Sequence, residues 1–282
     1  MSDLSAKQTV VREESGIRVV CVDSAYDVDE RNSTRDVVVT ASYTGVLCAR
    51  FVSAHSPRAA LGVDCAIGPE GASIAGLWYY EALNIPAAAV DVATVELGNG
   101  VDVYQKGVIS RLNEPALRCG VQSGMSVQEA AGLFLRNRPT ERLVPSAVTG
   151  RTIVAEAAGG AVVCTDSIAF ALPEDKGRNV LCTGGHTGRS AVPYLRAAQP
   201  RGFICSDGGR GRNDSGVRGL HIVQEDGLPG ATVDARTAKM GSGMSTYYDG
   251  VISDVNEGAR DLGVRVGMEA KAAAHLLLGA HE

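Results

Sequence analysis

The chain has 282 residues, 45% of them hydrophobic and 21% charged, which suits one large or two ordinary globular domains. Its net charge of −5 argues against a general binder of nucleic acid or anionic membranes, because such proteins present a basic face. No apolar run approaches the roughly 20 residues of a membrane-spanning helix, and the first residues lack the pattern of a secretory signal. We therefore expect a cytoplasmic protein with neither a nucleic-acid nor a membrane partner.

The first half of the chain alternates β-rich and helical segments. Residues 9–13 and 17–23 flank Ser15-Gly16, which predicts a hairpin. Further strands are predicted at 37–40, 59–66 and 87–95, and helices in a segment ending near residue 57 and at 74–83, 107–119 and 127–135. Ser73 is predicted to cap the helix at 74–83. Ser126 and Glu129 have the spacing of a capping box at the start of the helix at 127–135.

An internal repeat decides the predicted architecture. The run Val19–Ser24 recurs as Val162–Ser167, 143 residues later, and this register holds without a gap from Thr9 to Leu135 with about a third of the positions identical. We interpret the chain as a tandem duplication of an α/β unit, with a first repeat at 1–143 and a second at 144–282, joined by a linker at 136–145. Apolar strands alternating with helices predict a mixed, mainly parallel sheet in each repeat.

The second repeat follows the same plan. Asp214 or Ser215 is predicted to cap a helix over 217–224, which Gly227 ends. The repeats are expected to pack around a pseudo-twofold axis, as homodimeric ancestors do, although one continuous sheet is an alternative that the sequence leaves open. Seven cysteines, without CxxC or Cys/His spacing, predict buried thiols and no metal site.

Positions that differ between the repeats indicate where a site lies. Tyr43 corresponds to His186, Glu70 to Asn213 and Glu96 to Lys239. Loops of the second repeat are polar or charged where those of the first are mostly apolar or small, and such loops lie at the carboxyl ends of parallel strands, where α/β proteins bind ligands. The first repeat is therefore predicted to be a scaffold and the second to carry the site.

The chemistry of these loops favours a small anionic ligand. Glycines let backbone N–H groups converge, and guanidinium groups make fork-shaped contacts with carboxylates and phosphates. The predicted substrate-binding residues are Thr187, Arg189, Ser190, Arg210, Arg212, Asn213, Tyr43 and Glu70. The alternative is that the arginines pair with nearby carboxylates such as Asp207 or Asp214. The glycine pattern matches neither a Walker A loop nor GxGxxG, and the cofactor stays unknown.

His186 is the predicted general acid or base, since its ordinary pKa lies near neutrality and it stands in a Gly-rich loop. Asp207 and Asp214 are predicted to orient this histidine or a water molecule, and Lys239 to act as a cation or base at the same rim. The sequence thus favours an enzyme acting on a small anionic metabolite, with hydrolysis of a C–N bond ahead of isomerase or lyase chemistry on a small carboxylate. A non-catalytic binding protein for a phosphate or carboxylate is the alternative of another class, and a homo-oligomer is expected.

Overall fold

The structure is a computed structural model that describes residues 7–139, 144 and 149–279. Its internal contacts divide the chain into two compact units. Unit 1 comprises residues 1–65, 72–147 and 211–213, and unit 2 comprises residues 66–71, 148–210 and 214–282. Each unit therefore includes a short loop from the other half of the sequence. The predicted linker falls largely at residues 140–143 and 145, which lie outside the described residues.

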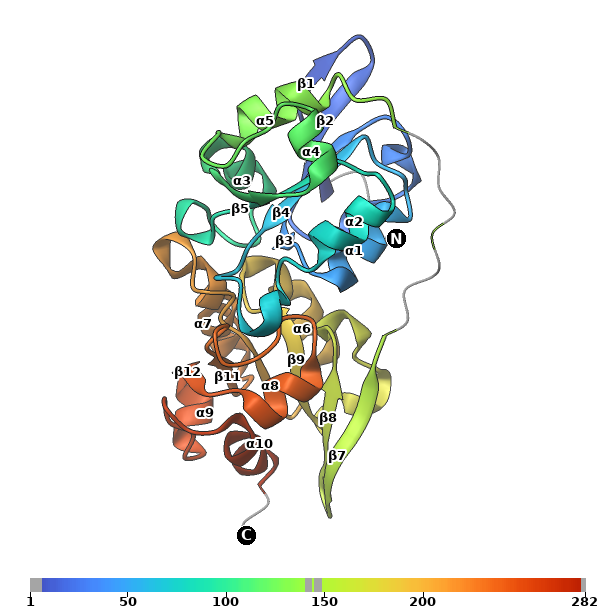
Figure 1. Ribbon diagram of the computed structural model, residues 1–282. Coiled ribbons are helices and arrows are strands. Elements are labelled where there is room, and N and C mark those ends of the chain that lie inside the picture. Colours follow the sequence, from blue (N-terminus) through green and yellow to red (C-terminus); the bar gives the residue numbers. More distant parts are fainter. Residues whose placement is uncertain (1–6, 140–143, 145–148, 280–282) are drawn as a thin grey trace. The chain divides into compact units, whose positions relative to one another are not determined.

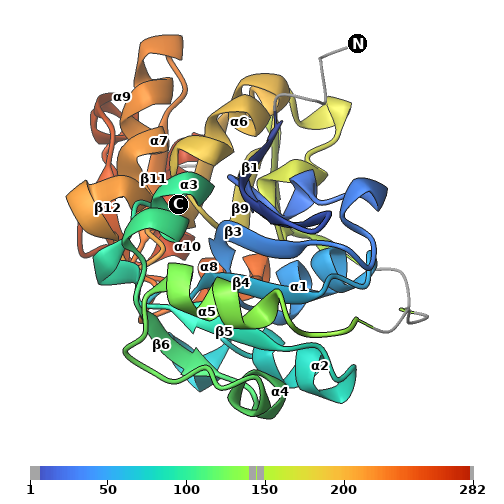
Figure 2. The same cartoon turned by 90° about the horizontal axis from the view of Figure 1, so that it is seen from above.

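Unit 1 is built on a six-stranded sheet in the order β1-β2-β3-β4-β5-β6 (Figures 1 and 2). Its strands are β1 (Gln8–Glu14), β2 (Ile17–Val22), β3 (Val37–Tyr43), β4 (Ala59–Val63), β5 (Ala87–Val90) and β6 (Ile109–Leu112). The four central strands are parallel, and β1 and β6 add antiparallel edges. Its helices are α1 (Val46–Ser53), α2 (Gly76–Ala82), α3 (Gly100–Lys106), α4 (Glu114–Arg118) and α5 (Val127–Phe134).

Unit 2 has a second six-stranded sheet with the same succession of strands, β7-β8-β9-β10-β11-β12. Its strands are β7 (Arg151–Ala157), β8 (Gly160–Thr165), β9 (Val180–His186), β10 (Gly202–Ser206), β11 (Gly230–Val233) and β12 (Ile252–Val255). Again the central four are parallel and the two edges antiparallel. Its helices are α6 (Val192–Ala198), α7 (Arg218–Ile222), α8 (Gly243–Asp249), α9 (Glu257–Asp261) and α10 (Ala270–Leu278). The expected α/β architecture of two units with mixed, mainly parallel sheets is thus confirmed.

Helices cover both faces of each sheet, so the central strands are buried and mostly apolar. In unit 1, α1 packs beside α2 (Figure 1), while α3 packs on α5 and on β2 and β3. In unit 2, one core lies between the sheet and α8, α9 and α10, and a second core holds side chains of α6 and α7. Burial on both faces explains the continuous apolar runs in the sequence.

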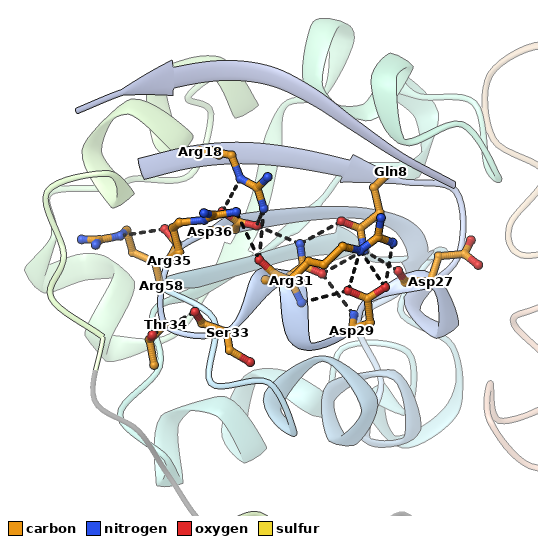
Figure 3. A network of polar contacts seen from close by, with 11 residues as sticks. Gln8, Arg18, Asp27, Asp29, Arg31, Ser33, Thr34, Arg35, Asp36 and Arg58 are labelled. Atoms are coloured by element: carbon orange, nitrogen blue, oxygen red, sulfur yellow. Dashed lines mark hydrogen bonds and ion pairs between the residues drawn. The ribbon is translucent and has the colours of Figure 1, made fainter. Parts of the chain in front are cut away.

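A buried polar network fixes the hairpin of unit 1 to the segment that leads into β3 (Figure 3). The carboxylate of Asp36 is fully buried and accepts hydrogen bonds from Arg18 Nε at 2.9 Å and Nη2 at 2.6 Å. Asn32 donates to the same carboxylate at 2.8 Å and exchanges two hydrogen bonds of 3.0 Å with Gln8. The network lies at the amino end of β3, away from the strand ends where α/β proteins bind ligands, so its role is structural.

Several predicted elements are confirmed. Both hairpins form, and Ser126 and Glu129 make the predicted capping box at α5, where each side chain pairs with the other's backbone. Gly227 ends its helical segment in the left-handed region, at φ 71°.

The helix predicted at 107–119 is wrong. The chain forms strand β6 there, and the helix α4 begins only after Asn113, which caps it through Ala116 N–H. Pro115 fits the first turn of a helix but not its interior, which is why the helix cannot extend through it.

Three other local predictions also need correction. Ser73 does not cap α2, because its hydroxyl donates to the carbonyl of Asp64 at 2.5 Å instead. Neither Asp214 nor Ser215 caps α7, since both lie inside a 3₁₀ turn at 212–217. The strand predicted at 87–95 ends at Val90, where a 3₁₀ turn capped by Asp91 begins.

Candidate functional site

His186 is the last residue of β9 and lies at the carboxyl end of the unit 2 sheet. Its side chain is 9% exposed, and its Nδ1 accepts a hydrogen bond from the backbone N–H of Gly188 at 3.0 Å. A nitrogen that accepts carries no proton, so the neutral ring holds its proton on Nε2. The glycine turn therefore fixes both the orientation and the tautomer of the histidine.

A close chain crossing requires glycine at position 184, two residues before His186. A Cβ on Gly184 would collide with the backbone of Gly241 and Ser242, and Gly241 N–H donates to the Gly184 carbonyl at 2.9 Å. The segment that starts α8 thus lies directly against the end of β9. Gly185, by contrast, has open space beside it.

Strand β10 brings Ser206 next to the histidine. Ser206 and His186 are register partners on adjacent parallel strands, and Thr187 N–H donates to the Ser206 carbonyl at 3.0 Å. The hydroxyl of Thr187 donates to the same carbonyl at 3.3 Å, while Ser206 Oγ accepts from Gly208 N–H at 3.1 Å. Its position at a strand end beside a Gly-rich loop is the sequence signal that makes the Ser206 hydroxyl a possible nucleophile, although Ser206 was not among the predicted site residues.

Asp207 joins two neighbouring loops of unit 2. It is 3% exposed, and its Oδ1 accepts hydrogen bonds from the N–H groups of Gly209 at 2.9 Å and Ala235 at 3.0 Å. Burial raises the pKa of Asp207, and these backbone donors offset part of the rise. Asp64, its counterpart in unit 1, accepts from Val92 N–H at 3.1 Å. The shared tie shows that this aspartate has a structural role in both units.

Arg210 and Asp214 form an exposed ion pair. Arg210 Nε donates to Asp214 Oδ1 at 2.8 Å, and its Nη2 donates to Asp254 Oδ2 at 3.2 Å. The hydrogen bond to Asp214 is the main cause that raises the Arg210 pKa. Asp254, on β12, also lies 3.5 Å from His221 Nε2, and the sequence analysis did not single it out. An anionic ligand at Arg210 would compete with these two carboxylates.

Lys239 belongs to a second polar cluster of unit 2. Its Nζ lies 2.8 Å from Oε1 of Glu70, in the loop of 66–71 that unit 2 includes, and this contact raises the Lys239 pKa. Its backbone N–H donates to Ser245 Oγ at 2.9 Å, and Ser245 in turn donates to Asp249 at 2.6 Å. Both side chains of the Lys239–Glu70 pair are substantially exposed.

Three of the predicted residues belong to unit 1. Tyr43 ends β3 and is buried. The side chain of Arg212 pairs with Asp102, and this contact raises the Arg212 pKa. The backbone N–H of Arg212 donates to the Val95 carbonyl at 2.8 Å. Asn213 donates to Glu96 Oε1 at 2.8 Å.

The predicted residues therefore fall into separate groups. His186 and Thr187 lie at the end of β9 beside Ser206 of β10, and Arg189 and Ser190 follow in a 3₁₀ turn with Arg189 exposed. Asp207 follows Ser206, and its side chain bonds to Gly209 and to Ala235 in the loop after β11. Arg210 and Asp214 form one pair and Lys239 and Glu70 another. Arg210 and Arg212, both predicted to bind an anion, pair with carboxylates of the protein.

The loop after β10 has an unusual backbone. Residues 208–211, 213 and 214 all have positive φ, between 52° and 78°. The corresponding loop after β4 repeats this at 65–68, 70 and 71, with Ile67 at φ 68°. A β-branched residue rarely adopts this conformation, so the loop of 65–71 is held in a strained shape by its surroundings.

Within the described residues, no group of three or more His, Cys, Asp or Glu side chains is arranged to hold a metal ion. No helix in that part of the chain has both the length and the apolar character needed to cross a bilayer. Comparisons with protein-family models, with curated proteins and with solved structures find no match for this chain.

Proposed function

We propose that the protein is an enzyme that hydrolyses a C–N bond in a small anionic metabolite, with His186 in contact with the reacting carbonyl group. The observation that carries the proposal is the hydrogen bond from Gly188 N–H to Nδ1, which places the proton of the neutral ring on Nε2. A neutral imidazole that donates to a carbonyl oxygen stabilises the negative charge that develops when water adds to the carbon. His186 is therefore proposed as an electrophile rather than as a base.

The base in this proposal is Asp207. Burial raises its pKa, which makes its carboxylate a better proton acceptor, and its two backbone hydrogen bonds hold it in place. Water would lose a proton to Asp207 and add to the carbonyl carbon. The C–N bond then breaks as the departing nitrogen takes up that proton.

The anion of the substrate is proposed to lie on the loops that follow β9 and β10. Arg189 and Arg210 give these loops positive charge, whereas the N–H groups of Gly188, Gly208 and Gly209 already donate within the protein. Because Arg210 already contacts Asp214 and Asp254, it supports a modest rather than a tight affinity for the anion. We also propose a cytoplasmic homo-oligomer whose repeats arose by duplication around a pseudo-twofold axis, with the first repeat as scaffold.

The test is turnover by the full chain on a panel of small amides, ureides and amidines that carry a carboxylate or phosphate, followed by release of ammonia or amine. His186→Asn is expected to lower kcat by about 10²- to 10³-fold, the usual effect of removing one donor to a developing oxyanion. The matched control is His221→Asn, at an exposed histidine of the same unit, which should keep full turnover.

Three outcomes count against the proposal. Full activity in His186→Asn would show that Nε2 has no role in the reaction. Turnover without release of a nitrogen compound would favour isomerase or lyase chemistry. Saturable binding of anions across the panel without any turnover would favour a non-catalytic binding protein.

A further inference from the structure

An aromatic pair fills the space between η2 (Ala25–Asp27) and α1 in unit 1. The ring of Tyr26 packs on the ring of Phe51, with centroids 4.5 Å apart and planes tilted by 60°. Tyr26 is held by its 3₁₀ turn, because its N–H donates to Oγ of the capping Ser24 at 3.3 Å.

Unit 2 builds the same turn without the first ring. Ala169 stands 143 residues after Tyr26, in η6 (Ile168–Phe170), and its N–H donates to Ser167 Oγ at 3.3 Å, as in unit 1. Tyr194 of α6 corresponds to Phe51. The backbone position and one aromatic partner are therefore retained, but the second ring is replaced by a methyl group.

A pocket of about 320 Å³ opens at this place in unit 2. Its walls are mostly apolar, and they are formed by Ile168, Ala169, Ala171, Leu172, Pro173, Lys176, Tyr194, Ala197 and Ala198. The volume is at the lower end of the range for small-molecule sites. The ring of Tyr194 offers the kind of surface on which another ring packs at an offset or tilted angle.

One cation lies among these apolar walls. Lys176 lines the pocket, its backbone pairs with that of Pro200, and its side chain is exposed. No lining residue is acidic, and no ion pair of Lys176 occurs within the described residues. A ligand with a ring and one negative charge would therefore complement both the shape and the charge of the pocket.

We propose that this pocket binds a small aromatic carboxylate, whose ring takes the place that Tyr26 occupies in unit 1 and whose carboxylate contacts Lys176. This site is separate from the one proposed for catalysis and does not depend on it. The proposal uses only residues of unit 2.

Benzoate is the probe, titrated into the full-length protein while the methyl NMR signals of alanine and leucine are followed. Saturable shifts are expected at Ala169, Leu172 and Ala197, with a dissociation constant on the order of 1 mM. Benzyl alcohol keeps the ring but lacks the charge, and it should bind about tenfold more weakly, the size expected for one charge-assisted contact.

Ala169→Tyr restores the ring of unit 1 and should abolish benzoate binding. Ala169→Leu fills the pocket with a smaller group and should weaken binding as well, so the test stands even if the tyrosine variant folds poorly. Lys176→Gln should lower affinity about tenfold, whereas Lys271→Gln, an equal charge change at an exposed position of α10, should leave it unchanged.

Two results would overturn the proposal. One is the absence of saturable shifts at the pocket alanines in the wild-type protein. The other is an unchanged benzoate affinity in both Ala169→Tyr and Ala169→Leu. Because His186 does not line this pocket, His186→Asn is expected to leave the affinity for benzoate unchanged.

Discussion

Asp175 is the centre of a buried network in unit 2 that corresponds to the one in Figure 3. Its side chain is fully buried and accepts hydrogen bonds from Arg151 Nη2 at 2.7 Å, Asn179 at 2.8 Å and Leu172 N–H at 2.7 Å. Burial alone would raise the pKa of Asp175, but these donors outweigh it and lower the pKa below its ordinary value.

The two networks contain the same groups at exchanged positions. Asp36 of unit 1 corresponds to Asn179, and Asn32 corresponds to Asp175. The arginine moves with the carboxylate, from position 18 in unit 1 to position 151 in unit 2. Each network thus keeps one buried carboxylate, its asparagine and its arginine, and unit 1 adds the amide of Gln8. A second buried carboxylate would repel the first, and a missing one would leave the arginine without its charge partner.

Asp175→Asn is expected to lower the free energy of unfolding by about 2–3 kcal/mol at neutral pH, since it removes a buried charged acceptor of four hydrogen bonds. The folded-state pKa of Asp175 is lowered, so its contribution is present above the ordinary carboxyl pKa and is lost as pH falls through the folded value. Denaturant unfolding should therefore show a gap between wild type and variant that narrows below about pH 4.

A transplant tests the same interpretation. Arg151→Gln, Ala161→Arg, Asp175→Asn and Asn179→Asp together rebuild the unit 1 network in unit 2, and a space of about 440 Å³ bordered by Ala161 can hold the new arginine. The fourfold variant should recover most of the stability lost by Asp175→Asn alone. Equal stability of the single and fourfold variants would contradict the exchange.

The contacts of the candidate site residues could be predicted from the sequence only in part. The Gly-rich setting of His186 indicated an oriented side chain, but not that Gly188 N–H would occupy Nδ1. The sequence also left open that loop arginines pair with nearby carboxylates, and Arg210 does pair with Asp214. Its second partner, Asp254, lies on a distant strand, which spacing along the chain cannot reveal.

At the scale of elements, the loops after β4 and β10 share a backbone but not a composition. Positions 65, 66 and 67 hold Cys, Ala and Ile with positive φ, whereas the corresponding positions in unit 2 hold Gly208, Gly209 and Arg210. Glycine adopts positive φ without a steric penalty. The loop of residues 65–71 therefore carries more backbone strain than the loop of residues 208–214.

Ala66→Gly is expected to stabilise the protein by up to about 1 kcal/mol, because relief of the left-handed strain at φ 61° exceeds the added entropy of the unfolded chain. Gly209→Ala, the reverse change at φ 78°, should destabilise it by about 1 kcal/mol. Thermal unfolding of the two variants measures both signs. A loss of stability in Ala66→Gly would show that the methyl group contributes packing that outweighs the strain.

Elements with local signals were predictable and those set by distant contacts were not. The capping box at Ser126 and the Ser15-Gly16 turn are complete within a few residues of sequence. Strand β6 is short, and its pairing with β5 is a tertiary contact, so the apolar residues at 107–119 were assigned to a helix despite Pro115. Ser73 satisfies a carbonyl nine residues away rather than the helix that follows it.

At the scale of the whole molecule, the repeat in sequence foresaw two units with the same succession of strands. The repeat did not predict that each unit includes a short loop from the other half of the sequence. Residues 66–71 belong by their contacts to unit 2, where a Cβ on Gly68 would lie 2.7 Å from the Ala235 carbonyl and Glu70 contacts Lys239. Residues 211–213 belong to unit 1, where Arg212 contacts Asp102.

This assignment predicts that neither half of the chain is fully stable by itself. A fragment of residues 144–282 lacks the loop that covers Ala235 and the partner of Lys239, so it should unfold at a lower temperature than the same residues in the full chain, by roughly 4 °C for each kcal/mol lost. Adding a separate fragment of residues 1–143 should raise that temperature in a concentration-dependent way, because binding stabilises the folded state by mass action. An equal amount of an unrelated protein serves as the control. If fragment 144–282 alone unfolds at the temperature of the full chain, the loop of 66–71 contributes nothing to unit 2 and the units follow the simple halves of the sequence.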